Sequence, residues 1–254
     1  MERVYDYKYG DLNIVDGIAL YEGKPVTGVV CSKGSSYAQY VDGIKHGIQK
    51  IYHADNGANT VALTETPYVN GVIEGIEKSY GKDGTLISEY SYKNNLRDGV
   101  CKDYWDNGSL QEECLYANNK REGVARTYWY NSDGKILRAE RQYANDELDG
   151  IYNDYYENGA LKEEGFCKKG KFEGSFKAYY QDGSLYYEAQ YIKGKLEGLV
   201  KYYYESGAIK EELLYKKGKK NELCKYYFEN GTIKCELQYL NGKLNREQKI
   251  YNED

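Results

Sequence analysis

The sequence predicts an all-β fold, an elongated single-layer antiparallel meander of about ten repeated β-hairpins that twists and curls. Its composition supplies two of the reasons. The 254 residues include 32 tyrosines but only 4 phenylalanines and 2 tryptophans, and 28 glycines stand against 2 prolines. Tyrosine favours β-strands and glycine favours tight turns. The third reason is an internal repeat, which also sets the order of the elements.

The repeat shows in three sets of turn residues. The first is a pair ending in glycine, from Asn56-Gly57 to Asn230-Gly231, with glycines 24 to 27 residues apart. The second runs from Gly47 to Gly198, and Glu222 and Arg246 continue it without glycine. The third runs from Gly71 to Gly242. All three suit tight turns or a positive φ, so each unit contains two turns and two short strands.

Two residue types recur after the second set. A basic residue stands three positions later in eight of nine repeats, and a tyrosine stands five positions later in all nine. We interpret these tyrosines as a structural ladder that stacks from repeat to repeat. In the regular repeats the ladder consists of Tyr80, Tyr104, Tyr128, Tyr155, Tyr179, Tyr203 and Tyr227.

The register of each hairpin follows from residue numbers. If the glycine pair is a two-residue loop, the residue numbers of any two residues that face each other in one hairpin add up to the same value. Cys101 and Cys114 then face each other, where they can bridge on oxidation, although two reduced thiols are the simpler interpretation in cytosol. Five Lys–Glu pairs also face each other: Lys78–Glu89, Lys102–Glu113, Lys177–Glu188, Lys201–Glu212 and Lys225–Glu236.

The regularity divides the chain into two parts. Residues 71–254 carry regular repeats and are predicted to form one continuous repeat domain. Residues 1–70 contain Pro25 and Pro67, and only 19 positions separate Gly28 from Gly47. We interpret them as degenerate repeats that form an N-terminal cap.

Composition and motifs disfavour several classes of function. No stretch approaches the roughly 18 apolar residues of a membrane span, and the N-terminus lacks a signal-peptide pattern, so we expect the cytoplasm. Six scattered cysteines and two histidines predict no zinc site. A net charge of −5 disfavours nucleic acid and suits a basic protein partner. No nucleophile elbow, phosphate-binding loop or metalloprotease motif occurs, so we expect no enzyme, cofactor or metal.

The position after each ladder tyrosine is usually aromatic but varies in type. Period-2 geometry puts it on the face opposite the ladder. Two interpretations stay open: a recognition surface, since tyrosine and tryptophan dominate binding hot spots, or a thin core inside the curled sheet. This aromatic stripe consists of Trp105, Trp129, Tyr156, Tyr180, Tyr204 and Phe228.

Segments 174–188 and 198–212 carry a family resemblance. Both follow the pattern G-x-x-K-x-Y-Y-x-x-G-x-[LI]-x-x-E. This pattern resembles the bacterial MORN-variant repeat, closely over residues 71–254 and loosely over residues 20–70. The resemblance implies a hairpin array that scaffolds protein contacts or touches lipids. Many bacterial proteins of this type are identified as YwqK-family antitoxins, and some accompany polymorphic toxins as immunity proteins.

The resemblance therefore implies a non-catalytic, cytoplasmic binding protein. In its most concrete form it is an antitoxin or immunity protein that binds and blocks a toxin encoded nearby. The alternative is a membrane-associated or protein-assembly scaffold, which predicts vesicle binding that weakens with salt. The lysines predicted to pair with glutamates disfavour that alternative. A surface adhesin would need a signal sequence.

The predicted fold has a direct solution test. Circular dichroism is expected to show β-structure with negligible helix, and small-angle scattering is expected to show an elongated particle, because neighbouring strands add about 4.8 Å each along a meander. A compact particle with substantial helix would contradict the repeat interpretation.

Overall fold

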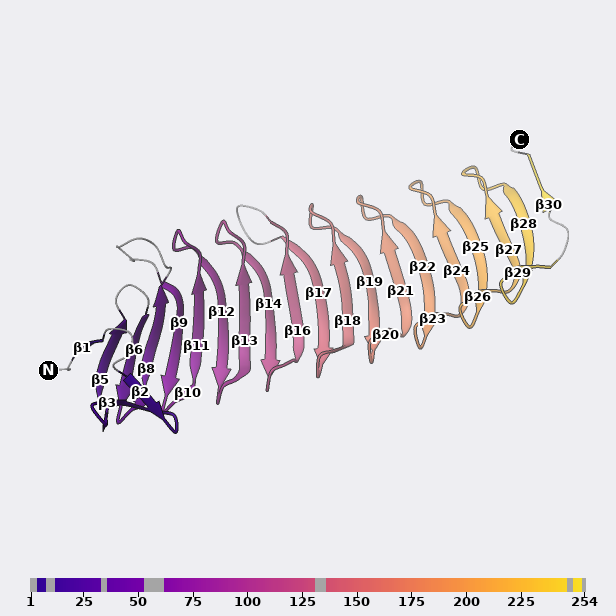
Figure 1. Cartoon of the computed structure of the whole chain (residues 1–254). Helices are drawn as coiled ribbons and strands as arrows, with labels where there is room; N and C mark the ends of the chain where they lie inside the picture. Colours follow the sequence, from indigo (N-terminus) through magenta and orange to yellow (C-terminus); the bar gives the residue numbers. More distant parts are fainter. Residues whose placement is uncertain are drawn as a thin grey trace. The chain divides into compact units, whose positions relative to one another are not determined.

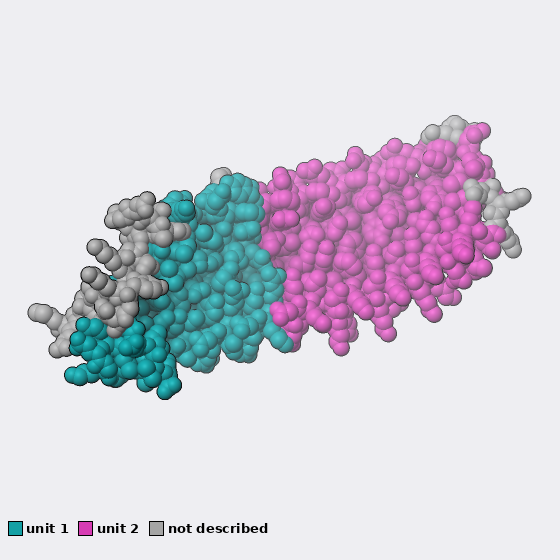
Figure 2. Space-filling model, viewed as in Figure 1, with its two compact units in different colours: residues 1–122, 130–134 teal, residues 123–129, 135–254 magenta. Residues whose placement is uncertain are grey.

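The computed structural model describes residues 4–7, 12–32, 36–52, 62–130, 136–245 and 249–252. Every regular element in these ranges is a β-strand, and from β5 onward each long strand pairs antiparallel with the next long strand (Figure 1). The predicted all-β meander is thus confirmed. The chain divides into two compact units, unit 1 with residues 1–122 and 130–134 and unit 2 with residues 123–129 and 135–254 (Figure 2). The sequence-based division at residue 70 stays a prediction.

Unit 1 contains a meander in which β5, β6, β8, β9, β11, β12, β13 and β14 pair in that order. Short strands such as β7 and β10 complete its turns. The strands of unit 1 are β1 (Val4–Tyr7), β2 (Leu12–Val15), β3 (Ile18–Tyr21), β4 (Lys24–Pro25), β5 (Gly28–Ser32), β6 (Ser36–Val41), β7 (Ile44–Lys45), β8 (Gly47–Tyr52), β9 (Ala62–Val69), β10 (Val72–Ile73), β11 (Gly75–Tyr80), β12 (Leu86–Lys93), β13 (Leu96–Tyr104), β14 (Leu110–Ala117) and β15 (Lys120–Arg121).

The first strands of unit 1 depart from a simple meander. Strand β1 pairs parallel with β5, and β2, β3 and β4 form a small sheet of their own. This sheet is tied to the meander by the Ala19 amide, which donates to the Gly43 carbonyl at 2.8 Å. Ala19 and Val26 are buried in this region. The small sheet therefore packs beside the first hairpins rather than extending them.

Unit 2 is a regular meander in which β16, β17, β18, β19, β21, β22, β24, β25, β27, β28 and β30 pair in order. Its strands are β16 (Gly123–Tyr128), β17 (Leu137–Ala144), β18 (Glu147–Tyr155), β19 (Leu161–Lys168), β20 (Lys171–Phe172), β21 (Gly174–Tyr179), β22 (Leu185–Ile192), β23 (Lys195–Leu196), β24 (Gly198–Tyr203), β25 (Ile209–Lys216), β26 (Lys219–Lys220), β27 (Glu222–Tyr227), β28 (Ile233–Leu240), β29 (Lys243–Leu244) and β30 (Lys249–Ile250).

All five predicted Lys–Glu pairs and the Cys101–Cys114 pair lie opposite each other, so the register is confirmed. The premise of a two-residue loop is wrong. In the hairpin of β24 and β25, the Tyr204 amide donates to the Ala208 carbonyl, and the Gly207 amide donates to the Tyr204 carbonyl. The loop is therefore longer than two residues. A β-bulge between Tyr202 and Tyr203 shifts the register by one residue. This shift compensates for the longer loop, so that Lys201 still faces Glu212 as expected.

The other turn of each repeat is a true two-residue hairpin loop. Lys217 and Gly218 join β25 to β26 with φ values of 52° and 80°, and Lys216 pairs with Lys219. Two successive positive φ angles define the type I′ turn, which matches the twist of the flanking strands. The glycines of all three turn sets that lie in the described ranges have positive φ. Asn56-Gly57, Asp133-Gly134 and Arg246 lie outside those ranges.

The two faces of the sheet in unit 2 differ in burial. Val200 and Cys224 are fully buried, and Leu213 is 2% exposed. They share one face, which we call the core face, with Phe176, Ala178, Tyr187 and Ala189. Half-buried tyrosines such as Tyr202 and Tyr215 pack against this cluster. The core is therefore a thin layer of large aromatic and small aliphatic side chains on one side of the sheet. The opposite side carries the Lys–Glu pairs, and we call it the ladder face. The same name is used for the side of the unit 1 sheet that carries Lys78–Glu89 and Lys102–Glu113.

Glu222 gives a test of the turn geometry, because it holds a φ of 65° where the equivalent residue of the preceding repeats is glycine. A left-handed conformation costs a non-glycine residue roughly 1–2 kcal/mol. Replacement by glycine would relieve this strain, but the greater conformational entropy of glycine in the unfolded chain offsets about 0.5–1 kcal/mol of the relief. We expect Glu222→Gly to raise the free energy of unfolding by about 0.5–1 kcal/mol, measured by urea denaturation. Glu222→Ala keeps the Cβ atom and is the control; an equal gain in both variants would contradict the strain argument.

Candidate interaction surfaces

Tyrosine and glutamate side chains join neighbouring hairpins across the ladder face. The Tyr203 hydroxyl donates to Glu188 of the preceding hairpin at 2.7 Å, and the Tyr227 hydroxyl donates to Glu212 at 2.7 Å. Glu212 also lies 3.9 Å from Lys201 Nζ in its own hairpin. Each such carboxylate thus touches its own hairpin and the next. Equivalent tyrosine–glutamate bonds are Tyr80–Glu65, Tyr104–Glu89, Tyr155–Glu140 and Tyr179–Glu164. Tyr128 holds the same position in β16.

These contacts shift the ionisation of both partners. Burial, and then the hydrogen bond to glutamate, raises the pKa of Tyr203 to about 12. The hydrogen bond from Tyr104 lowers the pKa of Glu89. The neutral phenol and the charged carboxylate are therefore the favoured forms in the folded protein. The adjoining Lys78–Glu89 pair, at 3.1 Å, is partly exposed and contributes about 0.2–1 kcal/mol at most.

The ladder face also carries a row of exposed apolar side chains, which the sequence analysis missed. In unit 2 this apolar row contains Ile151, Phe166, Leu199 and Leu223, of which Phe166 is 48% and Leu199 is 43% exposed. In unit 1, Ile76, Val100 and Leu115 occupy equivalent positions and are also exposed. The sequence contains the pattern that predicts this row, because an aliphatic residue follows most glycines of the second turn set, which runs from Gly47 to Gly198. Ser175 and Gln190 take the equivalent positions between Phe166 and Leu199, so the row in unit 2 consists of two apolar groups, Ile151 with Phe166 and Leu199 with Leu223. Grouped exposed apolar side chains are typical of interaction sites.

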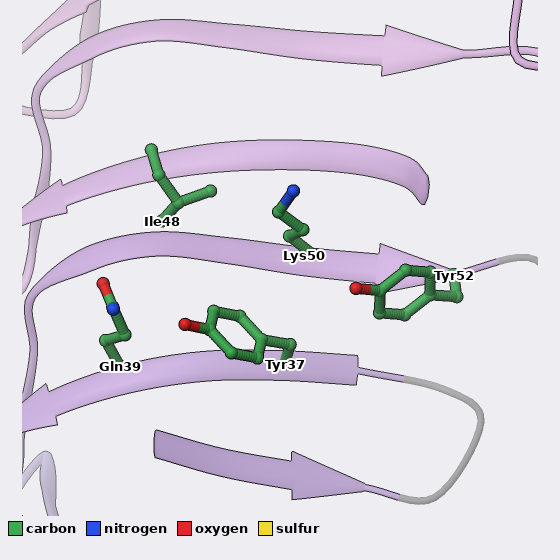
Figure 3. A pocket seen from close by; sticks show the side chains of 5 residues that line it. All are labelled: Tyr37, Gln39, Ile48, Lys50 and Tyr52. Atoms are coloured by element: carbon green, nitrogen blue, oxygen red, sulfur yellow. The ribbon is translucent and has the colours of Figure 1, made fainter. Parts of the chain in front are cut away.

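Shallow pockets interrupt the ladder face. One, of about 280 Å³, is lined by Tyr37 and Gln39 of β6 and by Ile48, Lys50 and Tyr52 of β8. Figure 3 shows the three β8 side chains projecting from the same face of their strand. Another pocket, of about 340 Å³ in unit 2, lies where Asn153 and Ser175 replace the usual basic and aliphatic residues.

The aromatic stripe lies at the edge of the core face and is half-buried. The hydroxyls of Tyr156, Tyr180 and Tyr204 donate to the backbone carbonyl of the ladder tyrosine of the next hairpin, at 2.8 to 2.9 Å. Trp129 Nε1 contacts the Tyr155 carbonyl at 3.3 Å. Phe228 lies under Lys234 Nζ at 5.5 Å.

Trp105 packs edge-on against the ring of Tyr130, and its Nε1 atom is buried without a hydrogen-bond partner in the described part of the chain. The tyrosines of the stripe thus use their hydroxyls to join neighbouring hairpins, while their rings stay partly accessible. Recognition by this stripe remains a prediction.

The described residues contain no group of three or more His, Cys, Asp or Glu side chains able to hold a metal ion. They also contain no helix that could cross a membrane. Cys101 and Cys114 are buried, opposed thiols, and burial raises the pKa of Cys101, which favours its unreactive protonated form.

Comparison with known families identifies the repeats. The model of the MORN repeat variant matches six segments, which together cover just over half of the chain: residues 73–94, 97–118, 148–168, 172–193, 196–217 and 223–241. The match does not extend to residues 20–70, where the sequence resemblance is loose, or to residues 119–147, although β16 and β17 keep the common register. No curated protein matches the chain. Repeats of this family make interaction proteins that contact protein or membrane partners.

The tyrosine–glutamate contacts predict alkaline sensitivity. The folded pKa of Tyr80, Tyr104, Tyr179, Tyr203 and Tyr227 is about 12, against an ordinary value of 10.0. Their contribution to stability is full below pH 10 and is lost as the pH rises from 10 to 12. We expect the urea midpoint to fall over this interval, together with the appearance of phenolate absorbance.

Tyr203→Phe is expected to reduce the fall of the urea midpoint between pH 10 and pH 12. At neutral pH it is expected to lower the free energy of unfolding by about 1 kcal/mol, because it removes a hydrogen bond to a carboxylate. Tyr251→Phe is the control, because the Tyr251 hydroxyl is exposed and lies 3.5 Å from Glu236. An unchanged urea midpoint between pH 10 and pH 12 would contradict this account.

Proposed function

The chain belongs to the MORN repeat variant family, and we propose that it is a non-catalytic, cytoplasmic binding protein that acts as an antitoxin or immunity protein. It binds a toxin encoded nearby and blocks it by covering its surface. The partner is a protein, and neither nucleic acid nor a cofactor takes part.

The apolar row on the ladder face is the observation that carries this proposal. A sheet face with exposed Leu199, Leu223 and Phe166 exposes apolar surface to water unless a partner covers it. Most lysines beside the row face a glutamate, and Lys201 Nζ lies 3.9 Å from the carboxylate of Glu212. The face therefore carries exposed apolar groups in a nearly neutral surrounding, which suits a protein surface better than a polyanion.

The rigidity of the ladder face supports the same proposal. The Tyr203 and Tyr227 hydroxyls are held by Glu188 and Glu212, each at 2.7 Å, so these side chains lose little further freedom when a partner binds. Ordering side chains on binding costs roughly 0.5–1.5 kcal/mol each. A surface whose polar groups are already fixed avoids much of this cost. It can therefore bind tightly over a flat area.

The test begins with a protein encoded beside this gene that arrests growth when expressed alone. Co-expression of the full chain is expected to restore growth, and the purified pair is expected to form a complex of fixed stoichiometry. Leu199→Asp places a charge in the apolar row and is expected to weaken binding tenfold or more and to abolish rescue. Ile250→Asp, at an exposed residue of the opposite face, is the matched control and is expected to rescue like the wild type.

Two outcomes would contradict the proposal. One is rescue that is indifferent to Leu199→Asp while the folded variant is present at normal levels. The other is a chain that captures no protein from its native lysate but co-purifies with lipid. The second outcome would favour the alternative, a membrane-associated or assembly scaffold, and salt-sensitive binding to anionic vesicles would then support it.

A further inference from the structure

One edge of unit 2 is strongly basic. Successive type I′ turns lie side by side at the lower edge of unit 2 in Figure 1, and each is bonded to the preceding repeat. The Gly194 amide donates to the Phe172 carbonyl, and the Gly218 amide donates to the Leu196 carbonyl, both at 2.8 Å. Nine exposed lysines occupy four of these turns, and we call them the lysine edge: Lys168, Lys169, Lys171, Lys193, Lys195, Lys216, Lys217, Lys219 and Lys243.

Backbone geometry gives independent evidence that charge matters at this edge. The first residue of the type I′ turn has a φ near 50°. It is asparagine at Asn70, Asn94, Asn118, Asn145 and Asn241, aspartate at Asp16 and Asp42, and glutamate at Glu22. In three consecutive repeats it is lysine instead, at Lys169, Lys193 and Lys217, with φ of 49°, 51° and 52°. Asparagine tolerates the left-handed region better than lysine does, so each lysine has a conformational cost. The same chain thus contains the better turn residue elsewhere and uses lysine only here.

The lysine edge is not neutralised by ion pairs of its own. No ion pair joins these nine ammonium groups to a carboxylate within the described ranges. The nearby carboxylates of Glu173 and Glu197 instead accept the backbone amides of Lys193 and Lys217, each at 2.7 Å. These two glutamates offset only a small part of the positive charge. The edge therefore attracts anions.

The lysine edge is short and bounded. The turn before it, formed by Asn145, Asp146 and Glu147, is exposed and acidic, and the Gly170 amide joins it to the Lys169 turn through the Leu148 carbonyl. Each repeat advances by two strands, or about 10 Å, so four turns span about 30 Å. A duplex or a bilayer would extend past this length and meet Asp146 and Glu147. The chain as a whole carries a net charge of −5, which repels a long polyanion further.

We propose that the lysine edge binds a short acidic segment of a partner protein in extended conformation. About ten extended residues cover the four turns. A pocket of about 360 Å³, lined by Lys168, Lys169, Lys171, Glu173 and Lys193, lies between the first two turns and offers a place for one carboxylate side chain. This site lies at the turns, apart from the apolar row, and it does not depend on the antitoxin proposal.

The test uses the full chain and a fluorescent peptide of about ten residues rich in aspartate and glutamate, with binding measured by anisotropy. The triple variant Lys169→Asn, Lys193→Asn and Lys217→Asn introduces asparagine, the residue that most other type I′ turns of the chain have at this position. It is expected to keep or raise the melting temperature and to weaken peptide binding about tenfold, because three exposed charge contacts are lost. Binding by the wild type is expected to weaken as salt is added.

The matched control removes the same charge from the same unit. Lys162→Asn, Lys210→Asn and Lys234→Asn change three exposed lysines that lie over the rings of Tyr156, Tyr204 and Phe228, away from the type I′ turns. This variant is expected to bind the peptide like the wild type. Leu199→Asp is also expected to leave peptide binding unchanged, which separates this site from the apolar row.

Three results would overturn the proposal. They are no peptide binding at low salt, equal loss of binding in the two triple variants, or tighter binding of phosphatidylserine vesicles or duplex DNA than of the peptide. A peptide in which asparagine and glutamine replace the acids is expected not to bind, and equal affinity for it would count against the role of charge.

Discussion

The backbone of each repeat passes through left-handed conformations in its two turns and at the start of its first long strand, and the lengths of the strands follow from them. Gly207 closes one hairpin, Lys217 and Gly218 close the other, and Glu222 starts the next long strand, all with positive φ. These turns fix which residues face each other, and a shift by one residue would move every side chain to the wrong face. The separation into a core face and a ladder face therefore depends on turn chemistry more than on hydrophobic burial.

The side-chain contacts then reinforce the register that the turns establish. Glu212 can meet Lys201 and the Tyr227 hydroxyl together only when both hairpins are in register. Each single contact is worth about 1 kcal/mol or less, so the backbone hydrogen bonds and the core face supply most of the stability. What the tyrosines and glutamates add is specificity between neighbours. A repeat slipped by one would leave a half-buried carboxylate without its hydroxyl partner.

Sequence reasoning reached the register but not all of its causes. Adding residue numbers placed Lys201 opposite Glu212 correctly, although the loop between them was assumed to be too short. The Tyr204–Ala208 loop is longer than two residues, and the bulge at Tyr202 compensates for the difference. Contacts between hairpins were harder to predict. The bond from the Tyr180 hydroxyl to the Tyr203 carbonyl depends on the offset of adjacent hairpins, which residue numbers within one hairpin do not contain. The parallel pairing of β1 with β5 has no signal in the repeat, since it joins segments outside it.

The two proposed surfaces show why function in such a protein lies in the differences between repeats. The ladder tyrosine and its glutamate are the same in nearly every repeat, so they cannot distinguish one part of the sheet from another. The first turn residue changes from Asn145 to Lys169 without changing the backbone angle by more than 3°, since φ is 52° and 49°. Lysine therefore replaces asparagine at this edge without changing the turn conformation, although at a conformational cost, and the surface charge can be selected repeat by repeat. A bounded run of lysines at strained positions is the pattern expected when a partner, rather than folding, determines the residue.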